Sequence, residues 1–304
     1  MLMSSKSLGL ELSPAGFSFA LASGGKLPLV EAGLSLPFAP GMLTLSRREP
    51  NITDAKGFVA QLKEAHLRLL TRERAVNVSL PDAVGRVVLL ELEARFRSRE
   101  EGLDVIRWKL KKSLPFDVGS VQLDYQILEE KENGAVSLLV SLISRAVVTQ
   151  YEELLVEAGL EPKLIDFTSF NLYRLFTPRL DLAEDGAFVS YYQGTMTVLI
   201  FNGGVLNFYR SKDAGGEVQH LFREVNSSFL VYGDQFPGQA VSEVFCMASP
   251  GDAESFRALV AEASSMEPVL LDLERTVRQG ATLGLDRPGM HALAGALGAA
   301  LRSL

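Results

Sequence analysis

Residues 8–25 read LGLELSPAGFSFALASGG, and this stretch decides the fold. Apolar residues alternate on both sides of the SPAG segment at 13–16, whose residues favour a tight turn. A second turn at 22–25 leads into another alternating run at 27–32. The stretch therefore predicts three antiparallel strands joined by two turns.

The same order of elements occurs twice along the chain. After the opening strands, the sequence predicts a helix that begins at Thr53 or Asp54 and then a strand at 75–80. The second copy consists of predicted strands and one helix at 187–192, 196–201, 205–210, 217–232 and 241–247. A recurring β-β-β-α-β unit predicts an α/β fold of two lobes around a cleft. This is the actin-like architecture, a duplicated RNase H-like fold.

The segment between the two copies predicts an inserted subdomain. Its elements follow the order β-α-β-β-α, and Ser98 with Glu101 forms a capping-box pair at the start of the first helix. A further helix at 168–176 completes the first copy. The predicted domains are a first lobe at 1–83 plus 166–185, an insertion at 84–165 and a second lobe at 186–304.

Composition excludes several classes of function. The chain has 304 residues, a formal net charge of −7 and a pI of about 5.2, so it has no overall attraction to nucleic acid or anionic lipid. The N-terminus lacks the plan of a signal peptide, and glycine turns interrupt the uncharged stretch at 186–209. We expect no nucleic-acid partner, and membrane contact only through partners.

Two segments carry a resemblance to a known family. Residues 108–116 read WKLKKSLPF, and residues 121–128 read VQLDYQIL. Together with the AGALGAALRS tail at 294–303, they resemble the PilM proteins of type IV pilus assembly, which are actin-like relatives of FtsA. The resemblance covers essentially the whole chain, and residues 107–128 are its most specific part.

The resemblance implies a cytoplasmic protein, peripheral at the inner membrane, that works with other pilus platform or motor components. It implies capture of the N-terminal cytoplasmic tail of a PilN-like bitopic protein, in a groove between the first lobe and the insertion. The candidate contacts are Trp108, Leu114, Pro115 and Phe116. Trp108 fits either the core of the insertion or an anchor in the groove. The basic run at 107–112 fits a solvated face, an acidic partner or lipid headgroups.

The resemblance also implies a site for ATP and magnesium between the lobes, and here the sequence departs from the family. Where the family carries Asp-x-Gly turns, this chain reads Glu11-Leu12-Ser13 and Ser190-Tyr191-Tyr192. The second turn has lost its carboxylate and gained a large ring. If nucleotide binding is retained, the candidate residues are Glu11, which is also the candidate metal ligand, Ser13, Gly194, Thr195, Thr197, Gly215, Gly216 and Gly251.

These substitutions predict that ATP hydrolysis is absent or very slow and that nucleotide binding is weak or lost, because phosphoryl transfer needs positioned metal and water. No catalytic residue is assigned, no cofactor is expected, and His66, His220 and His291 lack the spacing of metal ligands. The leading hypothesis is a scaffold. The alternatives are an ATP-binding switch or ATPase of the same fold, and an FtsA-like or GspL-like module of cell division or secretion.

Overall fold

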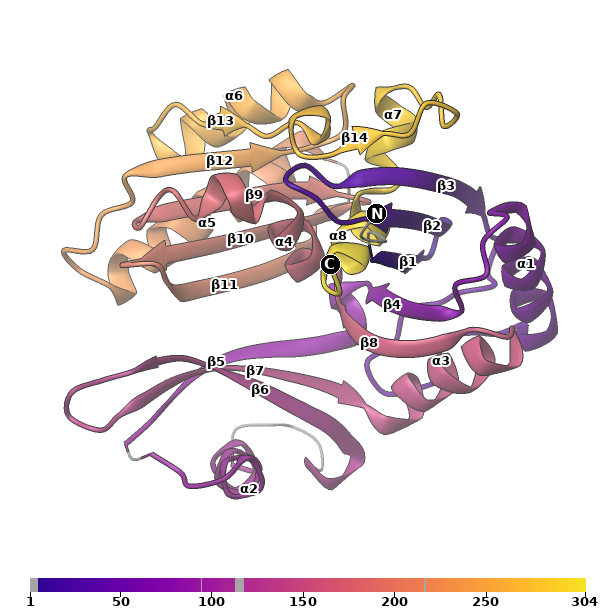
Figure 1. The fold of residues 1–304 in the computed structure, drawn as a ribbon. Helices are drawn as coiled ribbons and strands as arrows, with labels where there is room; N and C mark the ends of the chain where they lie inside the picture. The colour runs from indigo at the N-terminus through magenta and orange to yellow at the C-terminus, as the bar shows by residue number, and fades with distance from the viewer. Residues whose placement is uncertain (1–4, 94, 113–117, 216) are drawn as a thin grey trace.

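The computed structural model describes residues 5–93, 95–112, 118–215 and 217–304. Its three sheets form two lobes that lie side by side and a smaller unit that projects from them (Figure 1). Within the described residues, none of the helices is both long and apolar enough to cross a bilayer. Leu114, Pro115, Phe116 and Gly216, which the sequence singled out, lie outside the described residues.

The first lobe is built on a six-stranded sheet in the order β14-β3-β2-β1-β4-β8. Its strands are β1 (Lys6–Ser13), β2 (Gly16–Ser23), β3 (Leu29–Pro37), β4 (Ala75–Leu80), β8 (Glu161–Phe167) and β14 (Arg278–Gln279). Helix α1 (Ala55–Arg68) begins where the sequence predicted, because the Asp54 side chain accepts a 3.0 Å hydrogen bond from the Gly57 amide. It packs against α3 (Arg145–Glu157) beside this sheet.

The second lobe repeats this plan in a five-stranded sheet with the order β11-β10-β9-β12-β13. Its strands are β9 (Gly186–Tyr192), β10 (Thr195–Asn202), β11 (Val205–Asp213), β12 (Glu243–Met247) and β13 (Val269–Leu270). Helices α5 (Val218–Gln235) and α6 (Ala253–Ser264) pack together and bury their apolar faces in its core. Both lobes therefore contain the predicted β-β-β-α-β unit.

The smaller unit has its own sheet and its own core. Strands β5 (Gly85–Leu92), β7 (Val136–Ser144) and β6 (Val121–Glu130) form this sheet in the order β5-β7-β6. Helix α2 (Arg99–Leu110) covers one face and begins with the predicted cap, in which the Ser98 side chain accepts a 3.2 Å hydrogen bond from the Glu101 amide. Ile106 and Leu110 of α2 are buried against this sheet.

The structure divides the chain differently from the predicted domains. Helix α3 was assigned to the insertion, but its buried Tyr151 and Leu155 belong to the core of the first lobe. Strand β8, which the sequence analysis did not predict, extends the sheet of the first lobe beside β4. The last 27 residues were assigned to the second lobe, yet β14 pairs with β3 of the first.

Helix α8 (Ala294–Leu301) lies between the lobes, packed on β1 and on α4 (Thr168–Leu180). Short helix α7 (Arg287–His291) precedes it. Glycines allow backbone to touch backbone here, since a Cβ added at Gly9 would lie 1.8 Å from the Ala296 carbonyl oxygen. A Cβ at Gly298 would lie 1.9 Å from the Asn171 carbonyl oxygen. These contacts hold α8 against β1 and α4 at close range, while Ala296 and Leu297 of α8 share a core cluster with Phe188 and Tyr192 of the second lobe.

Candidate functional site

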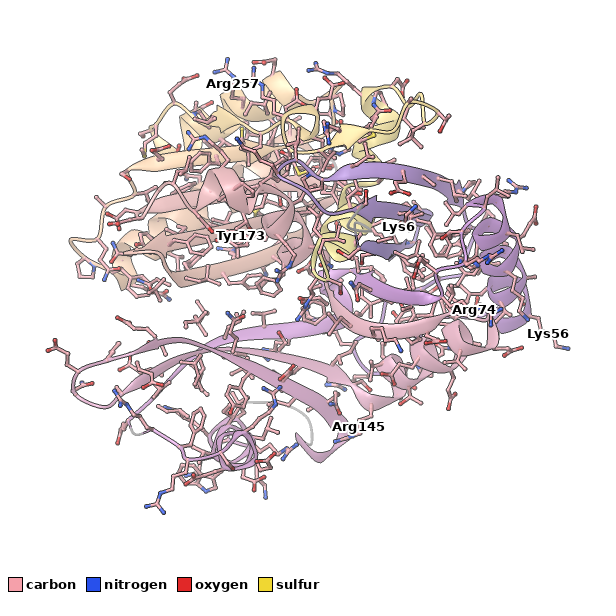
Figure 2. The ribbon with its side chains drawn as sticks, in the orientation of Figure 1. Lys6, Lys56, Arg74, Arg145, Tyr173 and Arg257 are labelled. Carbon is pink, nitrogen blue, oxygen red and sulfur yellow. The ribbon has the colours of Figure 1, made fainter. Side chains whose placement is uncertain are left out.

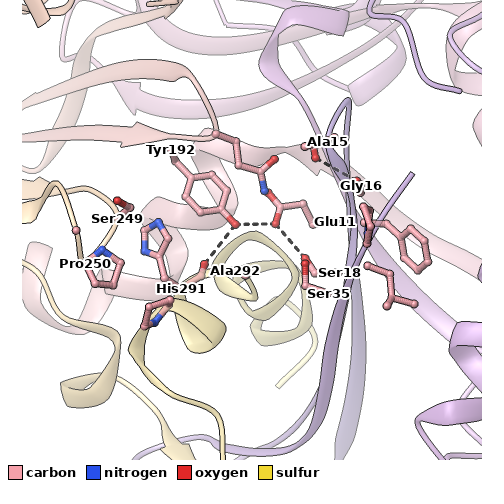
Figure 3. A pocket seen from close by; sticks show the side chains of 17 residues that line it. Glu11, Ala15, Gly16, Ser18, Ser35, Tyr192, Ser249, Pro250, His291 and Ala292 are labelled. Carbon is pink, nitrogen blue, oxygen red and sulfur yellow. Dashed lines mark hydrogen bonds between the residues drawn. The ribbon is translucent and has the colours of Figure 1, made fainter. Parts of the chain in front are cut away.

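The turns of the β1–β2 and β9–β10 hairpins meet in the cleft between the lobes (Figure 3). Two cavities, of about 560 Å³ and about 130 Å³, adjoin these turns, and both are lined by Glu11, Ser13, Tyr192 and Gln193. Gln193 has a φ of +48° and Gly194 a φ of +79°, which gives the tight second turn. The cleft between the lobes is thus split where the two turns approach each other.

A hydrogen bond closes this point of approach. The Tyr192 hydroxyl donates to Glu11 Oε2 at 2.8 Å, and the side chains come from opposite lobes (Figure 3). Both are buried, with 1% of Glu11 and 4% of Tyr192 exposed. The ring of Tyr192 is therefore buried at the position where the resemblance to the family leads one to expect a glycine.

The Glu11 carboxyl is almost fully buried and has several contacts with the protein. Ser18 donates a 3.3 Å hydrogen bond to Oε2, and a Cβ at Gly295 would lie 2.3 Å from the carboxyl carbon, so α8 packs directly on this group. Burial raises the pKa of Glu11 to about 7, although the hydrogen bonds from Tyr192 and Ser18 lower it. Glu11 is thus a structural acceptor between the lobes.

A second tyrosine makes a similar contact across the cleft. The Tyr209 hydroxyl of β11 donates to Asp82 Oδ1 at 2.7 Å, and the Ser169 amide donates to Oδ2 of the same carboxyl at 3.1 Å. Burial raises the pKa of Asp82, although the hydrogen bonds from Ser169 and Tyr209 partly lower it. Both contacts run from a tyrosine of the second lobe to a carboxylate of the first.

The candidate nucleotide residues are brought partly together. Glu11 and Ser13 line both cavities, Thr195 and Thr197 line the smaller one, and Gly251 lines the larger one. Gly194 and Gly215 have positive φ and shape turns, but neither lines these two cavities. Among the described residues, no group of three or more His, Cys, Asp or Glu side chains is arranged to hold a metal ion.

Sequence reasoning missed three residues of the cleft. Asp82 and Tyr209 carried no motif. His291 lacked ligand spacing, yet its ring lies 5.2 Å from that of Tyr192. Burial lowers the pKa of His291 to about 4, so it is neutral at pH 7. For Asp82 the available signal was its position directly after a buried strand and Pro81, at the edge of the cleft.

These residues do not fit a magnesium-bound triphosphate. Glu11 already accepts hydrogen bonds at Oε2, and Ser190 offers no second carboxylate. The cavity next to Thr195 and Thr197 has a volume of only about 130 Å³. Phosphate binding at these turns would first require Tyr192 and Glu11 to separate.

A larger cavity, here called the groove, lies between the smaller unit and the two lobes. Its volume is about 950 Å³, and it is lined by strands from all three sheets and by α4, including Tyr173, which Figure 2 labels. Its apolar lining contains Leu128, Leu139, Phe170, Tyr173, Leu199, Phe201 and Leu206. Charged side chains border it, with Arg99 paired to Asp124 and Arg302 paired to Asp166.

Trp108 does not reach the groove. Leu138, Val140 and Leu142 of β7 point toward α2, whereas Leu139 and Ser141 line the groove on the opposite face of the sheet. Trp108 lies on α2 and is 68% exposed. The interpretation as a core residue was therefore wrong, and a role as a groove anchor is not supported by its position.

Comparisons with known proteins agree with this architecture. A solved structure described as the PilM-PilN type IV pilus biogenesis complex contains a chain that superposes with a TM-score of 0.83 at 18% identity, over 97% of this chain and 98% of that one. A Bacteroides thetaiotaomicron protein described as having an actin-like ATPase fold superposes with a TM-score of 0.52 at 16% identity, over 96% of each chain. These likenesses confirm the predicted actin-like fold.

A third solved structure is the cytoplasmic domain of EpsL, an inner-membrane component of the Vibrio cholerae type II secretion system. It superposes with a TM-score of 0.52 at 15% identity, over 95% of this chain and 93% of that one. Among curated proteins, no match to the chain was found. A family model described as type IV pilus assembly protein PilM matches residues 30–229, which is more than half of the 304 residues. The chain therefore belongs to the PilM family of type IV pilus assembly proteins.

Proposed function

We propose that this protein is a scaffold at the cytoplasmic face of the inner membrane, where its groove captures the N-terminal cytoplasmic tail of a PilN-like membrane protein. The observation that carries the proposal is the groove itself. It is bounded by the first lobe and the smaller unit, and the second lobe supplies a third wall. The structural neighbour described as a PilM-PilN complex supports the class of partner.

The walls of the groove suit an extended peptide. Strands β6, β8 and β11 are each the last strand of their sheet, and residues of all three line the groove. An edge strand presents unpaired amide and carbonyl groups to which a peptide can add as a further strand. The apolar lining then offers pockets for alternate side chains of the peptide, which gives such an interaction its specificity.

The charges around the groove would set the register of the tail. Arg174 lines the groove and takes part in none of the ion pairs between described residues, whereas the neighbouring Asp166 is paired with Arg302. The Arg174 guanidinium is attracted to Asp166 but makes no close ion pair with it, so it is available to donate to a carbonyl or carboxylate oxygen of the occupant. Such contacts contribute more to orientation and specificity than to affinity.

The cleft supports a function without steady ATP hydrolysis. Tyr192 occupies the second phosphate turn and Glu11 is engaged by Tyr192, so a scaffold role needs no turnover to explain either residue. In this proposal nucleotide is not required for tail capture, and the lobes form a rigid support for the groove.

The proposal is tested by fluorescence anisotropy. The labelled peptide is the N-terminal cytoplasmic tail of a bitopic protein encoded next to this one. Ser141→Trp places a bulky ring in the groove and should abolish binding. Ser137→Trp is the matched control, since Ser137 lies on the same face of β7 but does not line the groove. Equal binding by both variants, or no binding by the unaltered protein, would refute the assignment.

A further inference from the structure

The exposed face of α2 ends in an unusual combination of side chains. Trp108 is 68% exposed, and Val105, one turn earlier, is 38% exposed. Lys111 and Lys112 follow at the spacing that places them beside Trp108 on a helix, and the Lys112 ammonium lies 5.5 Å from the centre of the indole. This is the largest aromatic side chain of the protein, and it is the only tryptophan among 304 residues.

The charges around Trp108 are separated along the helix. Glu101 and Asp104 lie on the N-terminal half of the same face, and Arg107 pairs with Asp104 at 3.1 Å. At the C-terminal end, neither Lys111 nor Lys112 pairs with a carboxylate among the described residues. Within the described part of the chain, the indole is therefore bordered by lysines that have no carboxylate partner.

From this charge pattern we propose that the C-terminal half of α2 contacts the anionic surface of the bilayer, with the Trp108 indole at the level of the headgroups and Lys111 and Lys112 among the phosphates. Tryptophan favours the membrane interface because one part of its ring is apolar and the other donates a hydrogen bond. Lysines next to such a ring add an attraction of their own to anionic lipid.

The shape of the surface favours a bilayer over an acidic protein. Trp108 stands on the convex side of a single helix and lines none of the cavities described above. Aromatic residues that anchor protein interfaces usually fill a well-packed pocket on the partner. A fluid lipid surface can surround a projecting indole without such a pocket.

The position of α2 relative to the groove agrees with this contact, although this argument rests on the proposed function. Arg99, the first residue of α2, lines the groove, and Trp108 lies roughly 14 Å further along the helix axis. A short tail that emerges from a bilayer and enters the groove would hold this helix close to the headgroups. From the sequence, membrane contact was expected only through partners, whereas here α2 itself would contact the bilayer.

The test uses the full chain without any tail peptide, so its result is independent of tail capture. Tryptophan emission reports on Trp108 alone. Vesicles that contain phosphatidylglycerol should shift this emission to the blue, lipids brominated on the acyl chain should quench it, and added salt should reverse both effects. Vesicles of phosphatidylcholine alone should produce a much smaller shift.

Each lysine near an anionic bilayer contributes roughly fivefold to the affinity, so Lys111→Glu/Lys112→Glu should weaken vesicle binding by at least about 25-fold. Lys56→Glu/Lys63→Glu on α1 is the matched control, because it makes the same change in net charge on another exposed helix surface. Equal loss in both variants, or no response to anionic vesicles, would overturn the proposal. So would a response to soluble polyglutamate but not to vesicles, which would assign the surface to an acidic protein.

Discussion

Tyr192 and Glu11 are 181 positions apart in the chain, and the hydroxyl of Tyr192 donates a 2.8 Å hydrogen bond to Oε2 of Glu11 in the cleft between the lobes. Glu11 lies near the end of β1 and Tyr192 is the last residue of β9, so each stands just before a hairpin turn at the cleft. Their contact makes each turn the partner of the other. The cleft therefore serves as an interface between lobes in this structure.

Removing the Tyr192 hydroxyl tests how much this interface contributes to the stability of the folded protein. Tyr192→Phe leaves the buried Glu11 without its shortest hydrogen bond, so we expect a loss of about 1–3 kcal/mol in the free energy of unfolding. Tyr125→Phe is the control, because among described residues its hydroxyl makes a single hydrogen bond, an exposed 3.4 Å contact with the Arg99 carbonyl. Urea unfolding measures both variants, and equal losses would contradict a special role for the cleft.

Glu11 should make stability depend on pH. The folded protein holds the Glu11 proton up to about pH 7, whereas an unperturbed glutamic acid releases it near 4.5. Between these values the folded state binds more protons, so this group lowers stability as pH rises. Glu11→Gln removes the effect. Relative to the unaltered protein, its free energy of unfolding should improve by about 3 kcal/mol between pH 4.5 and pH 7.

His291 acts in the opposite direction, because burial lowers its pKa from 6.5 to about 4 and the unfolded state then binds more protons in that range. This contribution is common to both proteins and cancels in their difference. Urea unfolding across the pH range therefore isolates Glu11. A difference that stays constant with pH would show that Glu11 does not titrate there.

The two tyrosine contacts should act together to hold the lobes. Tyr192→Phe/Tyr209→Phe removes both hydroxyls that reach across the cleft, and we expect faster amide hydrogen exchange in β9, β10 and β11 than in either single variant. Tyr232→Phe is the control, since its hydroxyl contacts only Gln239 of the same lobe. If exchange is unchanged in the double variant, these contacts do not hold the lobes together.

Replacing Gly298 of α8 and replacing Gly233 of α5 by alanine should have opposite effects on stability, because only Gly298 is closely packed. Gly298→Ala places a methyl group 1.9 Å from the Asn171 carbonyl oxygen, so we expect a loss of about 1–3 kcal/mol from overpacking. Gly233→Ala, in the helix α5, meets no atom within 4 Å and should stabilise the protein by about 0.5–1 kcal/mol. Thermal or urea unfolding checks both signs, and stabilisation by Gly298→Ala would contradict the packing.

The repeated hairpins could be predicted because each depends on local alternation and turn residues. Strand β8 could not, because it is an edge strand with Pro162 at its second position and only Phe167 fully buried, so its pattern is irregular. The position of α8 also escaped prediction. A helix rich in small residues was predicted near the end of the chain, but only the fold shows that Gly9 and Asn171 are what it touches.

The candidate site could likewise be predicted only in its local features. The substitutions at Ser190 and Tyr192 were visible in the sequence and indicated an altered phosphate turn. The alternation around Glu11 predicted a strand, but not that β1 is buried on both faces because α8 covers one of them. The contact between Tyr192 and Glu11 depends on how the two lobes meet, which no local pattern encodes.

We propose that the hydrogen bond between Tyr192 and Glu11 keeps the cleft closed and that this protein works without nucleotide turnover. Calorimetric titration of the full chain with Mg-ATP tests it most directly. We expect no measurable binding by the unaltered protein at micromolar nucleotide. Micromolar affinity accompanied by steady hydrolysis would contradict the account.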